Sequence, residues 1–279
     1  MTGTHGRIDA LQPRSTSGGA STRRRPGGRV RQRVAVILTG EFRLTVEGRE
    51  TELPGGAQRL VALLALRGRT ARSALAGTLW PETDEQRALA RLRTAIWRVN
   101  QVVPQLVESL GEQVYLTAHA EIDIREQVEH SMGVLGGGTV DAATWAAGVP
   151  AQDLLPDWHD EWLIDDRERL RQLRLHTLEG IAEQLCTQGH FGLAIDAALT
   201  ALRADVLRES AHRAVLRVHL AEGNLAEARR AYQVCVETFE RELGVQPTPA
   251  TSALLAACPP ATARLRSLPA TAAPPTRPR

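Results

Sequence analysis

The chain has 279 residues, of which 43% are hydrophobic, and only three cysteines. This length suffices for two ordinary cores, and three cysteines without a Cys-x-x-Cys pair indicate neither a disulfide framework nor a zinc site. We expect reduced thiols and a cytoplasmic protein, because the N-terminal residues lack the apolar segment of a signal peptide and no apolar run is long enough to span a membrane.

The charge is unevenly distributed along the chain. All 34 residues counted as Lys or Arg are arginine, and the net charge is only +2. Residues 1–33 carry +7 and residues 257–279 carry +4, whereas residues 34–118 carry +1 and residues 119–256 carry −10. This asymmetry favours a chain that holds an acidic partner at one end, although a basic tail beside an ordinary acidic domain explains it too.

Both ends have the composition of disordered segments. Ser, Gly, Arg and Pro dominate residues 13–29, and Pro, Ala and Thr dominate the C-terminal end. Such segments bury too little apolar surface to become ordered, so we predict a disordered basic tail over residues 1–33 and a Pro/Ala-rich tail over residues 257–279. The cluster Arg23–Arg25 offers phosphate contacts from a flexible arm, but a solvated tail accounts for it equally.

Residues 34–80 predict a small sheet followed by two helices. The β-rich runs VAVIL and FRLTV are separated by Thr39–Glu41, and a turn at Glu47–Arg49 leads into TEL, which predicts an antiparallel sheet. The apolar run AQRLVALLAL predicts a buried first helix. Residues 72–80 predict a short second helix that Pro81 interrupts.

Residues 84–103 predict a third, amphipathic helix with Asp84 or Thr83 as its cap. Its apolar residues follow a 3,4,3,4 spacing that makes one stripe: Leu89, Leu92, Ile96, Val99 and Val103. The opposite face is basic, with four arginines and no acid between Gln86 and Val103. Two helices joined by a short turn, the second of them basic, indicate a helix-turn-helix.

The basic face suits the major groove of DNA, where arginine can bridge guanine O6 and N7. Its predicted DNA-binding residues are Arg87, Arg91, Arg93, Thr94 and Arg98. The sequence leaves open which of them contact bases and which contact phosphates. Trp97 flanks this face, and we expect it to pack against a hairpin wing formed by residues 106–109 and 114–116 around Gly111.

Two blocks of sequence resemble the Streptomyces antibiotic regulatory protein family. GEFRLTVEGRETELPGGAQRLVALLAL and SALAGTLWPETDEQRALARLRTAIWRVNQ resemble its winged helix. DLLPDWHDEWLIDDRERLRQLRLHTLEGIAEQL and RESAHRAVLRVHLAEGNLAEARRAYQVCVETFERELGVQPTP resemble its bacterial transcriptional activator domain. The resemblance implies a mainly α protein, with a winged helix-turn-helix DNA-binding domain over residues 34–118 and an activator domain over residues 119–256.

The resemblance also implies a function. Members of this family activate operons for secondary metabolites by binding direct repeats of double-stranded promoter DNA and recruiting RNA polymerase. A winged helix covers only a short half-site, so we expect a homodimer on DNA. We expect no nucleotide-binding module of the kind that longer members carry, because only a tail follows Thr248.

The second half contains an internal repeat. A shift of 34 residues aligns Gly189 with Gly223, and it also aligns Ala194 with Ala228 and Ala197 with Ala231. This is the tetratricopeptide period, in which a glycine closes the turn between paired helices. Residues 162–188 are assigned in part to a diverged first unit, and Val206 stands where a proline would stop a helix sharply. The repeats would bind partner segments or only brace the winged helix.

Other chemistry finds little support. The cluster Asp157, His159, Asp160 and Glu161 reads as the start of a long helix rather than a metal site. His212 and His219 lie seven residues apart, too far for one zinc ion, and are assigned to packing or surface. Nucleotide-binding and nucleophile-elbow motifs are absent, so we expect no enzyme, cofactor or metal. The alternative function is a tetratricopeptide-type adaptor whose near-neutral winged helix docks protein.

Overall fold

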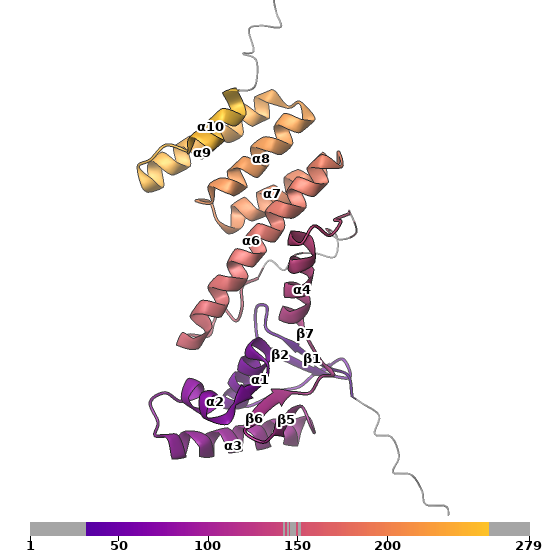
Figure 1. Ribbon diagram of the computed structural model, residues 1–279, viewed down its shortest axis with the longest axis vertical. Coiled ribbons are helices and arrows are strands. Elements are labelled where there is room, and N and C mark those ends of the chain that lie inside the picture. The colour runs from indigo at the N-terminus through magenta and orange to yellow at the C-terminus, as the bar shows by residue number, and fades with distance from the viewer. Residues whose placement is uncertain (1–31, 142, 144, 146–148, 150–151, 257–279) are drawn as a thin grey trace, which may run out of the picture. The chain divides into compact units, whose positions relative to one another are not determined.

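The computed structural model describes residues 32–256, apart from residues 142, 144, 146–148, 150 and 151. The two predicted tails and Arg23–Arg25 therefore lie outside the described residues, except for the last residues of the first tail. The described chain is mainly helical: small sheets and three helices come first and further helices follow (Figure 1). Of the helices in this described part, none is both long and apolar enough to cross a membrane.

The first strands form the predicted antiparallel sheet. β1 (Val34–Ile37) pairs with β2 (Arg43–Val46), which pairs with β3 (Arg49–Glu50). The turn between β2 and β3 has positive φ values of 52° at Glu47 and 75° at Gly48, the geometry that matches the twist of two paired strands. Because the turn is only two residues long, β3 begins at Arg49, ahead of the TEL run that was predicted to form it.

A fourth strand joins this sheet from beyond the predicted domain boundary. β7 (Ala120–Ile122) pairs parallel with β1, with Val34 opposite Ala120. The strand is only three residues long, and its pairing partner lies about 85 residues earlier in the chain, so local sequence carried little sign of it. Asp123 fastens the same edge, since its carboxylate accepts from the backbone N–H groups of Leu38 and Thr39 at 2.9–3.0 Å.

The predicted helix-turn-helix and wing are present. The helices and the wing strands are α1 (Gly55–Arg67), α2 (Arg72–Leu79), α3 (Glu85–Val102), β5 (Val107–Leu110) and β6 (Gln113–Leu116). β5 and β6 pair antiparallel, and a short strand that was not predicted, β4 (Thr70–Ala71), pairs with β6. The wing is thus a three-stranded sheet that begins directly before α2.

The buried stripe of α3 is shifted from the predicted one. Its buried residues are Ala88, Leu92, Ala95, Val99 and, just beyond the helix end, Val103. Leu89 and Ile96, which were predicted to be part of the stripe, are only partly buried and lie at its edge. Alanine at the centre of the contact lets α2 and α1 approach closely, and the larger side chains close the two sides.

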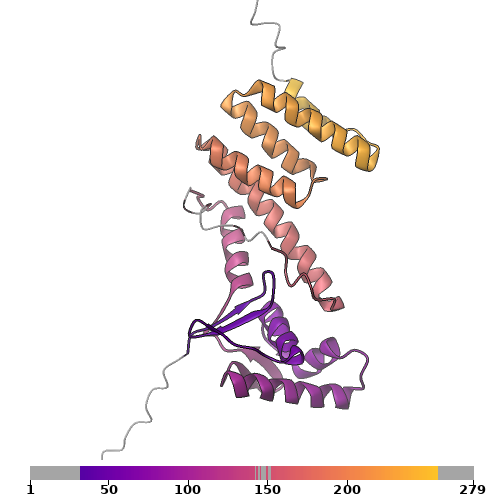
Figure 2. The ribbon, with the colours of Figure 1, turned by 180° about the vertical axis from the view of Figure 1, so that it is seen from behind.

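The second half consists of packed helices. They are α4 (Asp123–Leu135), a 3₁₀ turn (Glu161–Leu163), α6 (Ile164–Thr187), α7 (Phe191–Ala204), α8 (Glu209–Glu222), α9 (Leu225–Leu243) and α10 (Pro249–Ala256). Gly189 and Gly223, which the 34-residue shift aligns, have φ values of 80° and 86° at equivalent turns. The helical repeats are therefore confirmed as the pairs α6–α7 and α8–α9, successive in both views (Figure 2).

Two expectations for this half need correction. Residues 162–188 do not form a diverged unit of their own, because α6 is one long helix that pairs with α7. The replacement of proline by Val206 does not blur the end of α7, which stops at Ala204. Asp205 ends it instead, because its carboxylate Oδ1 accepts from the backbone N–H of Leu207 at 3.1 Å.

One of the two histidines of α8, His212, has a structural role. His212 is 4% exposed, its Nε2 lies 2.9 Å from the Val206 carbonyl oxygen, and its ring stacks edge-on against Phe239. Burial is the largest influence on its pKa and lowers it. The prediction of packing is thus confirmed for His212. Its side chain packs between Phe239 of α9 and the backbone at Val206, just before α8.

The core of the winged helix continues into α6. Leu154, Leu155, Leu163 and Leu170 belong to the same buried cluster as the residues of α1, α3 and β1. The backbone N–H of Leu155 donates to the carbonyl of Leu38 at 3.0 Å, so this segment lies alongside the end of β1. We call the contact between the winged helix and residues 153–174 the joint.

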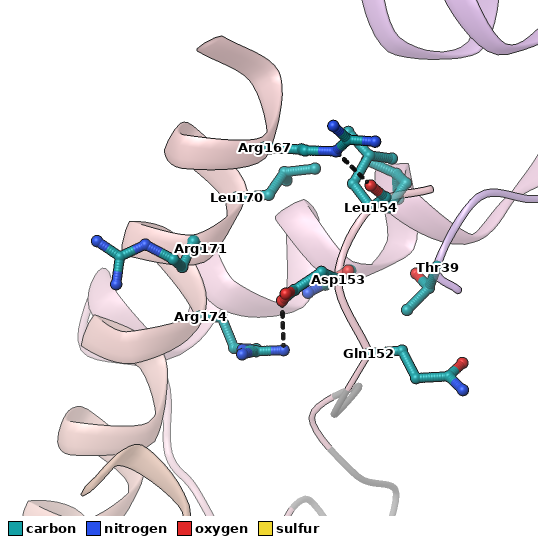
Figure 3. A pocket seen from close by; sticks show the side chains of 10 residues that line it. Thr39, Gln152, Asp153, Leu154, Arg167, Leu170, Arg171 and Arg174 are labelled. Carbon is teal, nitrogen blue, oxygen red and sulfur yellow. Dashed lines mark hydrogen bonds and ion pairs between the residues drawn. The ribbon is translucent and has the colours of Figure 1, made fainter. Parts of the chain in front are cut away.

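Arginines hold the joint from the side of α6. The guanidinium of Arg167 donates to the carbonyl oxygens of Leu154 at 2.8 Å, Trp158 at 2.6 Å, and Leu155. Arg174 forms an ion pair with Asp153 at 3.3 Å (Figure 3). The cavity between these side chains has a volume of about 20 Å³, room for one water molecule, and is too small for a ligand.

Two acidic residues, Asp160 of the DWHDEW motif and Asp166 of α6, complete the joint. Asp160 pairs with Arg59 of α1 at 3.1 Å, and Asp166 pairs with Arg67 at 3.5 Å. The expectation that this motif starts a long helix is therefore wrong in detail, because α6 begins only at Ile164. Its first four residues lie before the 3₁₀ turn, where Asp160 is used to pair with α1.

Candidate nucleic-acid interface

α3 packs with one side against α1, α2 and β5, and its other side faces outward (Figures 1 and 2). Asp84 caps it, since its Oδ1 accepts from the backbone N–H of Arg87 at 3.0 Å. Of the two residues predicted as caps, Thr83 is not used in this way; its hydroxyl accepts from Arg91 instead. A capped start orients the side chains of the first turn.

All five predicted DNA-binding residues are exposed on the outward face of α3. Arg87 pairs with Asp84 at 3.3 Å, and Arg91 Nη1 donates to the Thr83 hydroxyl at 3.0 Å. Arg93 and Arg98 make no hydrogen bond or ion pair with any residue that the structure describes. Two guanidinium groups are therefore free and two are held by a weak surface contact.

The surface contacts of Arg87 and Arg91 are easily exchanged for others. The Arg87 side chain is 82% exposed, and an ion pair in such a position contributes about 0 to 1 kcal/mol. A phosphate or a guanine edge offers acceptors of greater strength to the same guanidinium. All four arginines of the face are thus available to an anionic partner.

Trp97 does not pack against the wing, as the sequence suggested, but is 60% exposed. At about 100° per residue it lies nearly opposite Leu92 and Val99, on the outward face of α3. The wing is fastened to α3 by Asn100 instead. Its amide donates to the Val107 carbonyl at 2.9 Å and accepts from the Val107 N–H at 3.0 Å.

Asn100 is a positioning residue that the sequence did not reveal. No local pattern marks it, because its partner in β5 is brought near by the tertiary fold. Arg72 and Arg69 add to the same arrangement: Arg72 donates to Ser109 Oγ at 2.9 Å, and Arg69 lies 4.5 Å from the ring centre of Tyr115. The wing is thereby held against α2 and α3.

The helical repeats carry a separate groove between α6 and α8, with a volume of about 420 Å³. Its rim is charged on both sides, with Glu183 on α6 and Arg217 on α8. Glu179 is not free for a ligand, because it pairs with Arg208 at 2.6 Å. Burial raises the pKa of Cys186, which lines the groove, so its thiol stays protonated at neutral pH.

Comparisons with known proteins agree with this architecture. The model of the bacterial transcriptional activator domain matches residues 141–258. The fold resembles the structure of Mycobacterium tuberculosis EmbR in complex with a low-affinity phosphopeptide, with a TM-score of 0.66 and 16% sequence identity. The match covers 81% of this chain and 65% of the EmbR chain. A comparison of the sequence with curated proteins found no match.

The activator-domain match and the fold bear on the whole described chain. The first covers the helical repeats, and the second adds the winged helix before them. At 16% identity the likeness to EmbR concerns the fold alone. Residues 141–258 therefore match the bacterial transcriptional activator domain, and a winged helix precedes them in the chain.

Proposed function

We propose that the protein is a sequence-specific, cytoplasmic DNA-binding regulator that activates a biosynthetic operon. The outward face of α3 carries this proposal: five residues predicted from the sequence are exposed there together, and Arg93 and Arg98 have no partner within the described chain. No acidic residue follows Gln86 on the helix to repel phosphate. In this function the winged helix, expected over residues 34–118, is the DNA-binding domain.

We assign phosphate contacts to two of the arginines and base contacts to the other two. Arg87 and Arg91 lie in the first two turns of α3, where Asp84 and Thr83 hold their guanidinium groups. Phosphates that replace these two contacts would fix the position of the helix along the DNA. Arg93 and Arg98 are free to reach base edges. Each bidentate contact to guanine discriminates by about 1 to 3 kcal/mol.

Binding as a homodimer on direct repeats follows from the small size of the reading surface. A single exposed helix face covers a short half-site, and two linked contacts gain effective concentration over one. The expected signature is a steep dependence of binding on protein concentration. The dependence should become shallow when one of the two repeats in the DNA is scrambled.

We further infer that the groove between α6 and α8 contacts RNA polymerase, within the activator domain expected over residues 119–256. The groove is large enough for side chains of a docked segment, and Glu183 and Arg217 offer charges of both signs. Glu183 is exposed, so the Glu183→Arg variant should fold and bind DNA as the wild type does, but it should no longer activate transcription. Equal activation by this variant would remove the groove from the mechanism.

The test of DNA binding uses the purified chain and duplexes from its own upstream and neighbouring intergenic DNA, at two salt concentrations with unrelated duplex as competitor. We expect saturable shifts that survive competitor, weaken with salt and vanish in the Arg93→Ala, Arg98→Ala double variant. The matched control is the Arg203→Ala, Arg230→Ala variant. It removes the same charge from helices α7 and α9, where these side chains are 67% and 74% exposed.

A protein-docking adaptor is the competing function, supported by the near-neutral charge of residues 34–118. This function predicts that the same experiment finds no sequence-specific binding of DNA. Equal binding to every duplex, or no binding to any, would reject specific DNA recognition. A search for protein partners of the winged helix would then be the next step.

A further inference from the structure

Trp97 is the largest exposed apolar side chain on α3. It is 60% exposed, although tryptophan is usually well buried, and no other aromatic ring of the described chain stacks on it. The wing is held against α3 by Asn100 rather than by Trp97. A large apolar surface kept in water at the centre of a basic face calls for a partner.

Two smaller residues extend this apolar surface along the helix axis. Ala90, Thr94 and Trp97 lie within a sector of about 60° on the outward face. The Thr94 hydroxyl donates to the carbonyl of Ala90 at 3.1 Å, so its proton is already used and its methyl group remains for contact. The strip spans about 10 Å along the helix, or about three base-pair steps.

Arginines flank the strip on both sides. Arg93 is one turn before Trp97, and Arg98 is one turn after Thr94, so each pair neighbours on the helix surface. Neither guanidinium has a partner in the described residues. A protein partner with an apolar patch would have to cover these charges, whereas duplex DNA neutralises them with phosphates and guanine edges.

We propose that Trp97 reads the C5-methyl groups of thymines in the major groove, as the centre of an apolar strip completed by Ala90 and Thr94. The thymine methyl group is the one apolar feature that a base pair presents there. The strip therefore selects for thymine at positions between those read by the arginines. This inference rests on the proposed DNA binding and adds the residue that determines part of its specificity.

The experiment removes the methyl group alone. Duplexes bound by the wild-type chain are first selected from a random pool. Each thymine of the selected site is then replaced singly by deoxyuridine, which pairs as thymine does. Affinities are measured for the wild type, Trp97→Ala and Gln101→Ala. The last variant changes an exposed residue one turn beyond Trp97 and serves as the control.

We expect the wild type to lose affinity about fourfold for each contacted methyl group. At those positions Trp97→Ala should bind thymine and deoxyuridine duplexes equally, and Gln101→Ala should still discriminate. The thermal midpoint of Trp97→Ala should match the wild type, because the side chain is largely exposed.

The outcomes separate the two proposals. If the wild type selects no duplex over random DNA, the proposed function fails and the inference fails with it. If it binds specifically but prefers no thymine, tolerates deoxyuridine everywhere, or discriminates as well after Trp97→Ala, the inference alone is overturned. If Trp97→Ala still distinguishes thymine from deoxyuridine, the exposed side chain of Trp97 would instead be a candidate contact for another protein.

Discussion

The joint and the outward face of α3 use the same residue type in opposite ways. At the joint, Arg167 donates to three carbonyl oxygens of the chain and Arg59 forms an ion pair with Asp160. On α3, Arg93 and Arg98 have no acceptor in the described residues. The contrast shows that arginine content says little about function until the acceptors within the fold are known.

The largest expected effect concerns the shared core of the joint. Leu163 is fully buried in the cluster of the winged helix, and Leu163→Ala should lower the free energy of unfolding by about 2 to 5 kcal/mol. Its neighbour Ile164 is 61% exposed, so Ile164→Ala is the matched control and should change stability by less than about 0.5 kcal/mol. Urea unfolding measures both. Equal effects would mean that the two halves do not share a core.

A crossed pair of variants tests the contrast directly. Arg167→Ala leaves buried carbonyl groups without a donor and should cost about 1.5 to 3 kcal/mol of stability. Arg98→Ala should leave stability within about 0.5 kcal/mol of the wild type and weaken DNA binding. Unfolding midpoints and DNA titrations of both variants provide the comparison. A stable Arg167→Ala variant would contradict the assigned role of the joint arginines.

A smaller effect is expected for the ion pair between α1 and the start of the joint. The side chains of Arg59 and Asp160 are 53% and 15% exposed, and a partly solvated pair contributes about 0 to 1 kcal/mol. Arg59→Ala should therefore lower stability only slightly, and by less in high salt. A loss as large as that of Leu163→Ala would show that charge, rather than the core, holds the joint.

The smallest effect is a pH dependence, which tests whether the two halves unfold together. Burial lowers the pKa of His212, so the folded chain binds fewer protons than the unfolded chain around pH 6. Its contribution to stability is present above the unfolded pKa and is lost as the pH falls through the folded pKa. His212→Gln should reduce the loss between pH 8 and pH 5, measured as urea midpoints.

Because His212 lies in α8, the same titration reports on the joint. The probe is a variant in which Trp80, in the winged helix, is the only tryptophan. If the joint makes the two halves one cooperative unit, the urea midpoint seen by Trp80 fluorescence should fall with pH as the midpoint of the helical repeats does. A winged helix that unfolds at an unchanged midpoint would separate the two halves.

Elements with a long local signal were predictable. The first and third helices, the hairpin wing and the paired helices around Gly189 and Gly223 each follow from periodicity or a turn residue within one segment. The strand Ala120–Ile122 was missed because its partner is β1, and Trp97 was misplaced because the wing contacts Asn100 instead. Both errors concern contacts between segments distant in sequence.

By itself the sequence determined that α3 exposes its four arginines and Thr94, because the 3.6-residue period places them away from the apolar side of the helix. It also determined the 34-residue repeat, since equivalent glycines close equivalent turns. Only the tertiary structure decided which arginines are free. Arg167 and Arg98 look alike in the sequence. They differ because the fold brings carbonyl oxygens to Arg167, whereas no described residue offers an acceptor to Arg98.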